Sequence, residues 1–122
     1  MQKIVISGQI TAETADQVRS IISGLDRSKP LLLELNSDGG SVQAGITIHN
    51  LLAGWQGGLT VDVVGWALSV ASAIVQAGQV RRAHASALLM VHAPWMAATG
   101  NAAEFREQAD LLDVVSKTMA AI

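Results

Sequence analysis

The feature that most constrains the fold is a short apolar run that ends in two glycines and leads straight into a helical pattern. Residues 31–35 read Leu-Leu-Leu-Glu-Leu, and Asn-Ser-Asp-Gly-Gly-Ser follows at once. A near-continuous apolar run of this length is typical of a strand that is buried on both faces of a parallel sheet. Because glycine has no Cβ, Gly39 and Gly40 would let another group come very close to the backbone at the tip of this strand.

Strand-like and helix-like patterns alternate along the whole chain. The strand patterns cover residues 3–6, 31–35, 59–65 and 87–92. The helical patterns cover residues 11–25, 41–54, 67–77 and 102–122, with Thr11 or Thr14 and then Ser41 as expected caps of the first two. This alternation predicts an α/β fold with parallel strands. A length of 122 residues predicts a single domain, 1–122.

Composition excludes several classes of function. Half of the residues are apolar and only 15% are charged, which is more apolar matter than a monomer of this size usually buries, so a subunit interface is expected. The formal net charge is -2 and no basic stripe is present, so nucleic acid is not an expected partner. The absence of cysteine excludes disulfides and thiolate metal sites.

No targeting or membrane signal is visible either. The first ten residues lack a long apolar stretch, and no apolar run reaches the roughly 18 residues that a membrane span needs. We therefore expect a soluble, cytoplasmic protein. Asp38 has no second acidic residue close in sequence that could join it in holding a metal, and no cofactor motif is apparent.

Two strand-to-helix junctions could carry chemistry. Gly39-Gly40-Ser41 precedes one helical pattern, and Ser69 lies just inside the helix predicted after the strand that ends at Gly65. Helix N-termini expose unpaired N–H groups and a partial positive charge. Two such N-termini facing each other would stabilise a developing oxyanion, and a serine between them could attack a carbonyl carbon.

A serine nucleophile needs a base within hydrogen-bond reach. The three histidines are His49, His84 and His92. His92 ends a predicted strand, so it should share with Ser69 the sheet edge at which ligands of parallel sheets bind. His49 falls inside a helix and His84 in a connecting segment. Taken singly, a serine in a small-residue helix and a histidine at a strand end are more often structural.

Three motifs occur in an order that resembles the ClpP family of serine peptidases. They read LNSDGGSVQAGITIHNLL, GWALSVASAIVQAG and LLMVHAPW, and the resemblance covers roughly residues 30–122. Together with GNAAEF and ADLLD, the motif HAPW looks most similar to the ClpP-like peptidases of phages and prophages, which are often implicated in capsid maturation.

The resemblance implies a catalytic set. Ser69 matches the nucleophile of the family and His92 matches the general base. The backbone N–H groups of Gly40 and Val70 match the oxyanion hole, and Gly39 shapes the turn. The glycines at the strand tip would then let a scissile carbonyl oxygen reach a backbone N–H.

The resemblance also implies a substrate site and an assembly. The segments Ser41-Val42 and Ala93-Pro94 match those that hold a polypeptide substrate as an added strand. The expected fold is a ClpP/crotonase-like spiral of ββα units that ends in a long handle helix and lacks the C-terminal part of the family fold. The family assembles as homo-oligomers, in a heptameric ring or a stacked tetradecamer. It usually receives chains from a separate ATP-driven unfoldase, and since no nucleotide motif is visible here, any use of ATP would belong to that partner.

The match departs from the family at two places. Asp38 stands where the family has proline, and its charge would oppose an oxyanion nearby. No residue matches the triad aspartate, which in the family lies beyond the handle helix. Asp110 and Asp113 belong to that helix and are expected on a solvated or inter-ring face. Because the acid orients and stabilises the imidazole, we expect this chain alone to show little peptidase activity.

Two alternative functions stay open beside a ClpP-like serine endopeptidase. The first is a catalytically impaired, ring-forming assembly subunit, which fits the unmatched acid and the Ala- and Leu-rich last helix. The second is a crotonase-type enzyme acting on acyl-thioesters, which shares the spiral fold and the oxyanion hole but lacks the Ser/His pair at these places.

Overall fold

The computed structural model describes residues 1–92 and 98–122, and the chain divides into two compact units, 1–91 and 92–122. The elements of the first unit are β1 (Gln2–Ser7), α1 (Ala12–Ser23), β2 (Leu31–Ser37), α2 (Val42–Leu52), β3 (Leu59–Leu68), α3 (Val70–Val75), β4 (Val80–Ala83) and β5 (Leu88–Met90). The second unit contains α4 (Ala102–Ala120). The predicted alternating α/β fold is confirmed, whereas a single domain stays a prediction.

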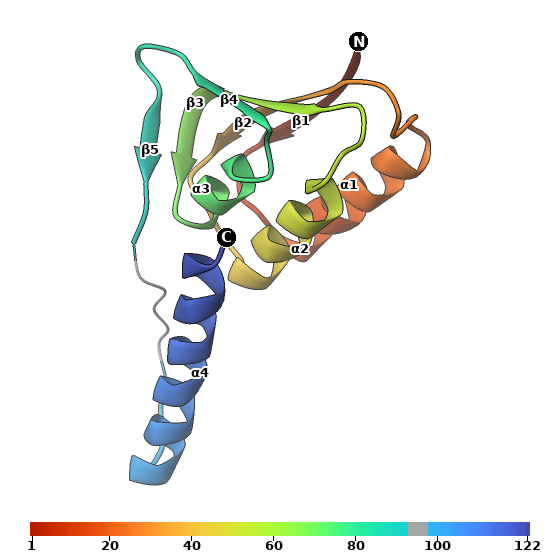
Figure 1. Ribbon diagram of the computed structural model, residues 1–122. Coiled ribbons are helices and arrows are strands. Elements are labelled where there is room, and N and C mark those ends of the chain that lie inside the picture. The colour runs from red at the N-terminus through yellow and green to blue at the C-terminus, as the bar shows by residue number, and fades with distance from the viewer. Residues whose placement is uncertain (93–97) are drawn as a thin grey trace. The chain divides into compact units, whose positions relative to one another are not determined.

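The first unit is built on a parallel sheet with the order β1-β2-β3-β4. The fifth strand, β5, pairs in parallel with the second half of β3. Helices α1, α2 and α3 all lie on one side of this sheet (Figure 1). The core therefore sits between the three helices and the strand residues that face them.

Burial on β2 alternates, which corrects one prediction. Leu31, Leu33 and Leu35 are fully buried, but Leu32 and Glu34 between them are only partly buried. The strand is therefore not buried on both faces, because the helices of this unit cover one face of the sheet. On the other face Glu34 pairs with Lys3 of β1 at 2.7 Å.

The helix caps follow the sequence. Thr11 caps α1, and a reciprocal bond from its own N–H to the Thr14 hydroxyl completes a capping box. Ser41 caps α2, accepting from the N–H of Ala44 at 3.1 Å. Each cap satisfies an amide that the first helical turn leaves unpaired.

Helix α2 buries one stripe of residues against the rest of the first unit. Its buried residues are Ala44, Gly45, Ile48 and Leu52. Helix α3 approaches closely at Gly45, where a Cβ would overlap the side chain of Val70. Helix α2 therefore turns its smallest residue toward α3.

A bulge in β3 shifts its register with β2 and changes the direction of the strand. The register with β2 shifts between Leu35 and Ser37, so that three residues of β3 lie opposite Asn36 alone. The Asn36 Oδ1 accepts the N–H of Trp66 at 2.9 Å. A Cβ at Gly65 would come within 2.5 Å of that same oxygen, so glycine makes room for the bond. The side chain of Asn36 thus fills the gap that the bulge opens.

This bulge accounts for most errors in the predicted boundaries. The sequence favoured a strand over 59–65 and a helix over 67–77, but β3 continues to Leu68 and α3 begins at Val70. Residues before the bulge pair with β4 and residues after it pair with β5. Strand β4 was not predicted at all, because all four of its residues are exposed and it carries no apolar alternation. Strand β5 is shorter than the predicted 87–92.

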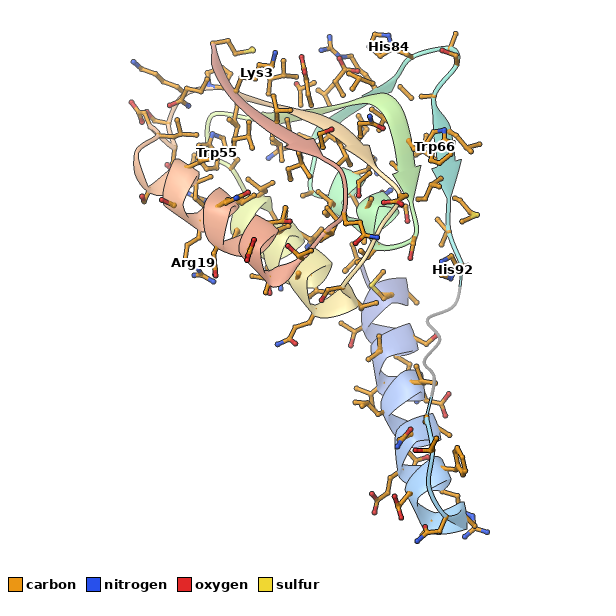
Figure 2. All side chains as sticks on the ribbon, turned by 180° about the vertical axis from the view of Figure 1, so that it is seen from behind. Lys3, Arg19, Trp55, Trp66, His84 and His92 are labelled. Atoms are coloured by element: carbon orange, nitrogen blue, oxygen red, sulfur yellow. The ribbon has the colours of Figure 1, made fainter. Side chains whose placement is uncertain are left out.

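The tryptophans of the first unit lie in opposite environments. Trp55 is 1% exposed, donates its indole N–H to the Lys29 carbonyl at 2.8 Å and carries the Arg27 guanidinium over its ring. Trp66 is half exposed and lies beside β5, opposite Leu88 (Figure 2). The first is therefore a core residue and the second a surface residue.

The second unit consists mainly of α4, which confirms the predicted helix over 102–122. Asn101 caps it by accepting from the N–H of Glu104 at 2.9 Å. Among the residues that the structure describes, no helix is both long and apolar enough to cross a membrane.

Candidate active site

The loop between β2 and α2 is fixed by backbone hydrogen bonds. The Ser37 hydroxyl is buried and accepts from the N–H of Gly39 at 3.1 Å. Ile10 donates to the Gly39 carbonyl at 2.9 Å, and the N–H of Ser41 donates to the Ile10 carbonyl at 2.8 Å. Gly40 lies between these bonds as an isolated bridge partner of Ile10. The strand tip is therefore held from both sides.

Both glycines of this loop are required by their surroundings. Their φ angles are 104° at Gly39 and 147° at Gly40, values that residues with a side chain rarely adopt. A Cβ at Gly39 would lie 2.8 Å from the Ser69 Cβ and 3.0 Å from the Leu68 carbonyl oxygen. A Cβ at Gly40 would overlap the backbone of Ile10. The fold thus brings Gly39 and Ser69 close together.

Ser69 occupies a strained turn between β3 and α3. Its φ is 55° and its ψ is -129°, and it is the one non-glycine residue with a positive φ in the described part of the chain. Such a conformation costs on the order of 1–3 kcal/mol and persists only where the surroundings hold it. The N–H of Ser69 donates to the Met90 carbonyl at 2.9 Å, and its own carbonyl accepts from the N–H of Ser72 at 3.0 Å. A serine on a sharp strand-to-helix turn is the arrangement that exposes a nucleophile.

The hydroxyl of Ser69 is left out of helix capping. Ser69 precedes α3 as its N-cap, yet its side chain makes no capping hydrogen bond, unlike Thr11 at α1 and Ser41 at α2. Serine at an N-cap ordinarily accepts from an amide of the first turn. Because Ser69 is also partly exposed, its hydroxyl is available to an external group. This places Ser69 just before α3, where the sequence favoured a position just inside the helix.

Two amides near this serine are suited to stabilising negative charge. Within residues 1–91, the N–H groups of Gly40 and Val70 donate no backbone hydrogen bond. Amides without an acceptor are the donors from which an oxyanion hole is built. The assignment of Gly40, Val70 and Gly39 to an oxyanion hole stays a prediction, and their chemistry fits it.

The predicted substrate segments divide into a described and an undescribed part. Ser41 has both its N–H and its hydroxyl engaged, by Ile10 and Ala44, so a substrate strand there would use other groups of the segment. Val42 is the first residue of α2. Ala93 and Pro94 lie outside the described residues.

The predicted base belongs to the second unit. His92 is exposed and follows β5 by two residues. Ser69 lies in the first unit, so the pairing of the two stays a prediction. The other two histidines are engaged within the first unit: His49 contacts the Asn50 side chain at 2.9 Å, and His84 lies 3.5 Å from Asp62, which Arg82 also approaches at 3.7 Å.

The remaining predicted features add no further group to the site. Asp110 and Asp113 lie on α4, where the sequence placed them. Asp38 does not cap α2, since Ser41 does. Among the described residues, no group of three or more His, Cys, Asp or Glu side chains lies close enough together to hold a metal ion.

Sequence reasoning missed several residues that shape this site. Ser37 orients the glycine loop, Ile10 anchors it, Asn36 directs β3 toward Ser69, and Ser72 contacts the Ser69 carbonyl. The pair Asn36-Ser37 at the end of an apolar run was the one available signal, because both residue types bond readily to nearby backbone. The roles of Ile10 and Ser72 depend on contacts that sequence spacing does not reveal.

Comparison with known proteins shows the family of the chain. The sequence model of the Clp protease family matches residues 1–122. The chain belongs to the Clp protease family. It is 30% identical over 124 residues to the ATP-dependent Clp protease proteolytic subunit 3 of Streptomyces coelicolor, an alignment that covers 97% of this chain and 57% of that protein.

Other members of the family show similar likeness. The ATP-dependent Clp protease proteolytic subunit of Pleurastrum terricola is 30% identical over 98% of this chain and 63% of its own length. Subunit 1 of Mycobacterium bovis is 27% identical over 95% of this chain and 60% of its own length. The chain thus spans about three fifths of the length of the curated relatives that it matches.

Proposed function

We propose that this chain is the nucleophile-bearing part of a ClpP-type serine peptidase. The observation that carries the proposal is Ser69, a serine held at a positive φ between a strand and a helix, with a hydroxyl that caps nothing. The contact of this residue with Gly39 supports the same assignment, because it brings the glycine loop against the nucleophile.

The chemistry follows from the roles assigned to each group. The Ser69 Oγ attacks the carbonyl carbon of a polypeptide while His92 takes the hydroxyl proton. The N–H groups of Gly40 and Val70 donate to the oxyanion of the tetrahedral intermediate. His92 then gives its proton to the leaving amine, and a water molecule hydrolyses the acyl-enzyme by the same steps.

The group that orients His92 is unassigned in this proposal. Neither Asp110 nor Asp113 on α4 is given that role, in keeping with the absence of a sequence match to the triad acid. Without an orienting acid, the proton transfer from Ser69 is slower by orders of magnitude, whereas oxyanion stabilisation persists. A reagent with a good leaving group depends less on an orienting acid than a peptide bond does, so it is the more sensitive probe of Ser69.

Assembly into a homo-oligomeric ring is part of the proposal. Trp66, Leu88 and Met90 form an exposed apolar stripe on one face of β3 and β5, as the strand register requires. On α4, Phe105, Leu111 and Val114 are each about half exposed. Exposed apolar surfaces of this kind are typical of subunit contacts. A heptameric or stacked arrangement and an ATP-driven unfoldase partner stay predictions, as do a cytoplasmic location and the likeness to phage peptidases.

The second candidate is a ring-forming assembly subunit without peptidase activity. The exposed apolar residues of α4 favour it, because they serve assembly whether or not Ser69 reacts. No separate observation among the described residues favours a crotonase-type enzyme.

The test is the intact mass of the chain after incubation with a fluorophosphonate. We expect a single adduct that is lost in Ser69→Ala and kept in Ser23→Ala, a matched change of an exposed serine on α1 whose hydroxyl bonds only to the Ser20 carbonyl. His92→Ala should slow formation of the adduct. An unmodified wild-type chain, or an adduct that persists in Ser69→Ala, would leave the assembly subunit as the better description.

A further inference from the structure

The start of α3 departs from an ordinary helix N-terminus. In an ordinary cap, the amide of the third helical residue donates to the side chain of the N-cap residue. Here the third residue is Ser72, and its N–H donates at 3.0 Å to the main-chain carbonyl of Ser69 instead. The amide that would normally engage the Ser69 hydroxyl is therefore occupied elsewhere.

The side chain of Ser72 makes a second bond to the same carbonyl. Its hydroxyl donates to the Ser69 oxygen at 2.5 Å, and the residue is only 5% exposed. Serine hydroxyls in helices often bond to a carbonyl three or four residues earlier. This bond differs because its acceptor belongs to the one non-glycine residue with a positive φ among those described.

We infer that Ser72 is a positioning residue that holds Ser69 in its reactive conformation and keeps the Ser69 hydroxyl free. The inference rests on the proposed function, since it assigns Ser72 a role in the same site. Any change in the Ser69 backbone that moved its carbonyl oxygen away from Ser72 would break both bonds. The Ser72 hydroxyl would then be buried without a partner, which proteins avoid. The loss of these two bonds opposes the relaxation of Ser69.

Sequence alone assigns Ser72 an ordinary packing role, because small residues surround it on α3. Packing and positioning predict different effects of Ser72→Ala. If the residue only packs, alanine serves as well and Ser69 keeps its conformation. If it positions Ser69, the turn loosens although little volume is lost.

The first experiment is amide hydrogen exchange measured by NMR on the whole chain. In Ser72→Ala we expect the Ser69 amide, which donates to the Met90 carbonyl, to exchange about three to ten times faster. The control is Thr14→Ala, which removes a capping hydroxyl on α1 and should leave the Ser69 amide unchanged. An unchanged exchange rate at Ser69 in Ser72→Ala overturns the inference.

A second variant separates the hydrogen bond from volume. Ser72→Cys keeps a side chain of similar size but replaces a strong donor by a weak one. We expect it to behave as Ser72→Ala does. A Ser72→Cys chain with wild-type exchange at Ser69 would show that filled volume, and not the hydroxyl, holds the turn, and would overturn the inference as well.

The rate of fluorophosphonate labelling connects the turn to reactivity. We expect both Ser72 variants to label at Ser69 about three to ten times more slowly per folded molecule, and Thr14→Ala to label at the wild-type rate. Wild-type labelling in both Ser72 variants would overturn the inference while the proposed function stands. A wild-type chain that never labels would overturn the proposed function, and hydrogen exchange at Ser69 would still decide the role of Ser72.

Discussion

Replacing Gly39 by alanine tests the contact that joins the two junctions of the site. Gly39 has a φ of 104°, and a Cβ there would lie 2.8 Å from the Ser69 Cβ and 3.0 Å from the Leu68 carbonyl oxygen. Gly8 provides a matched control, because its φ is 91° and a Cβ there would meet nothing within 4 Å. Both substitutions place a side chain at a positive φ, but only Gly39→Ala also forces a methyl group against Ser69 and Leu68.

The expected magnitudes follow from these two terms. Positive φ costs an L-residue roughly 1–2 kcal/mol, which applies to both variants. Forcing a methyl group into the packed contact with Ser69 costs about 1–3 kcal/mol more, and applies to Gly39→Ala alone. For a chain of this size, 1 kcal/mol lowers Tm by about 4 °C. Gly39→Ala should therefore melt clearly below Gly8→Ala.

Urea unfolding gives the two free energies, and fluorophosphonate labelling reports on Ser69. In Gly39→Ala we expect slower labelling per folded molecule, because the methyl group displaces the turn that carries the nucleophile. Gly8→Ala should label as the wild type does. Equal stability losses for the two variants, with equal labelling, would refute the contact between Gly39 and Ser69 and with it the geometry of the site.

Three further changes test other parts of the first unit. Gly45→Ala should lower the free energy of unfolding by about 1–3 kcal/mol, because its Cβ would overlap the Val70 side chain. In a double-mutant cycle, the same change made in a Val70→Ala background should cost much less of that free energy. Asn36→Ala removes the acceptor at the β3 bulge and should cost about 1 kcal/mol in urea unfolding, whereas an unchanged midpoint would argue against its role there. Hydrogen bonds from the Ser28 hydroxyl and N–H lower the pKa of Asp26 from its usual 3.8, so Ser28→Ala should raise it in an NMR titration. Because the folded-state pKa is the lower one, this carboxylate stabilises the fold at and above its ordinary pKa, and the effect disappears as pH falls through the folded pKa; an unshifted titration in Ser28→Ala would contradict this.

The sequence predicts most of the elements because their signals are local. The caps at Thr11 and Ser41 are read directly from residue type, and the apolar run at 31–35 predicts a strand wherever it pairs. Burial on both faces of that strand was wrong, since an apolar Leu32 does not reveal that the helices of the first unit cover only one face.

The boundary between β3 and α3 could not be predicted from the same signals. Residues 63–75 are apolar almost throughout, so strand and helix periodicities are equally compatible with them. The bond from the Trp66 amide to Asn36 decides the outcome, and it joins residues that lie far apart in sequence. Strand β4 was missed for the opposite reason, because it carries exposed arginines where an apolar pattern would be needed.

The candidate site, like the fold, could be predicted from the sequence only in part. The sequence places Gly39 and Ser69 at two separate strand-to-helix junctions, and the structure brings these two residues close together. The positive φ of Ser69 and the bond from the Ser72 hydroxyl to its carbonyl are not indicated by any sequence motif. The pairing of Ser69 with His92 stays a prediction.

The surroundings of Ser69 give a physical reason for its strained backbone conformation. A serine that capped α3 in the ordinary way would lend its hydroxyl to the helix, and a nucleophile engaged with a backbone amide would have to break that bond before reacting. The positive φ turns the residue out of that geometry, and the bonds to Met90 and Ser72 offset what the turn costs. Strain and capping are thus alternatives at this position. A substitution that relaxes the turn should stabilise the helix end and reduce the reactivity of Ser69 together, which is the combination that separates a preorganised nucleophile from a serine that merely begins a helix.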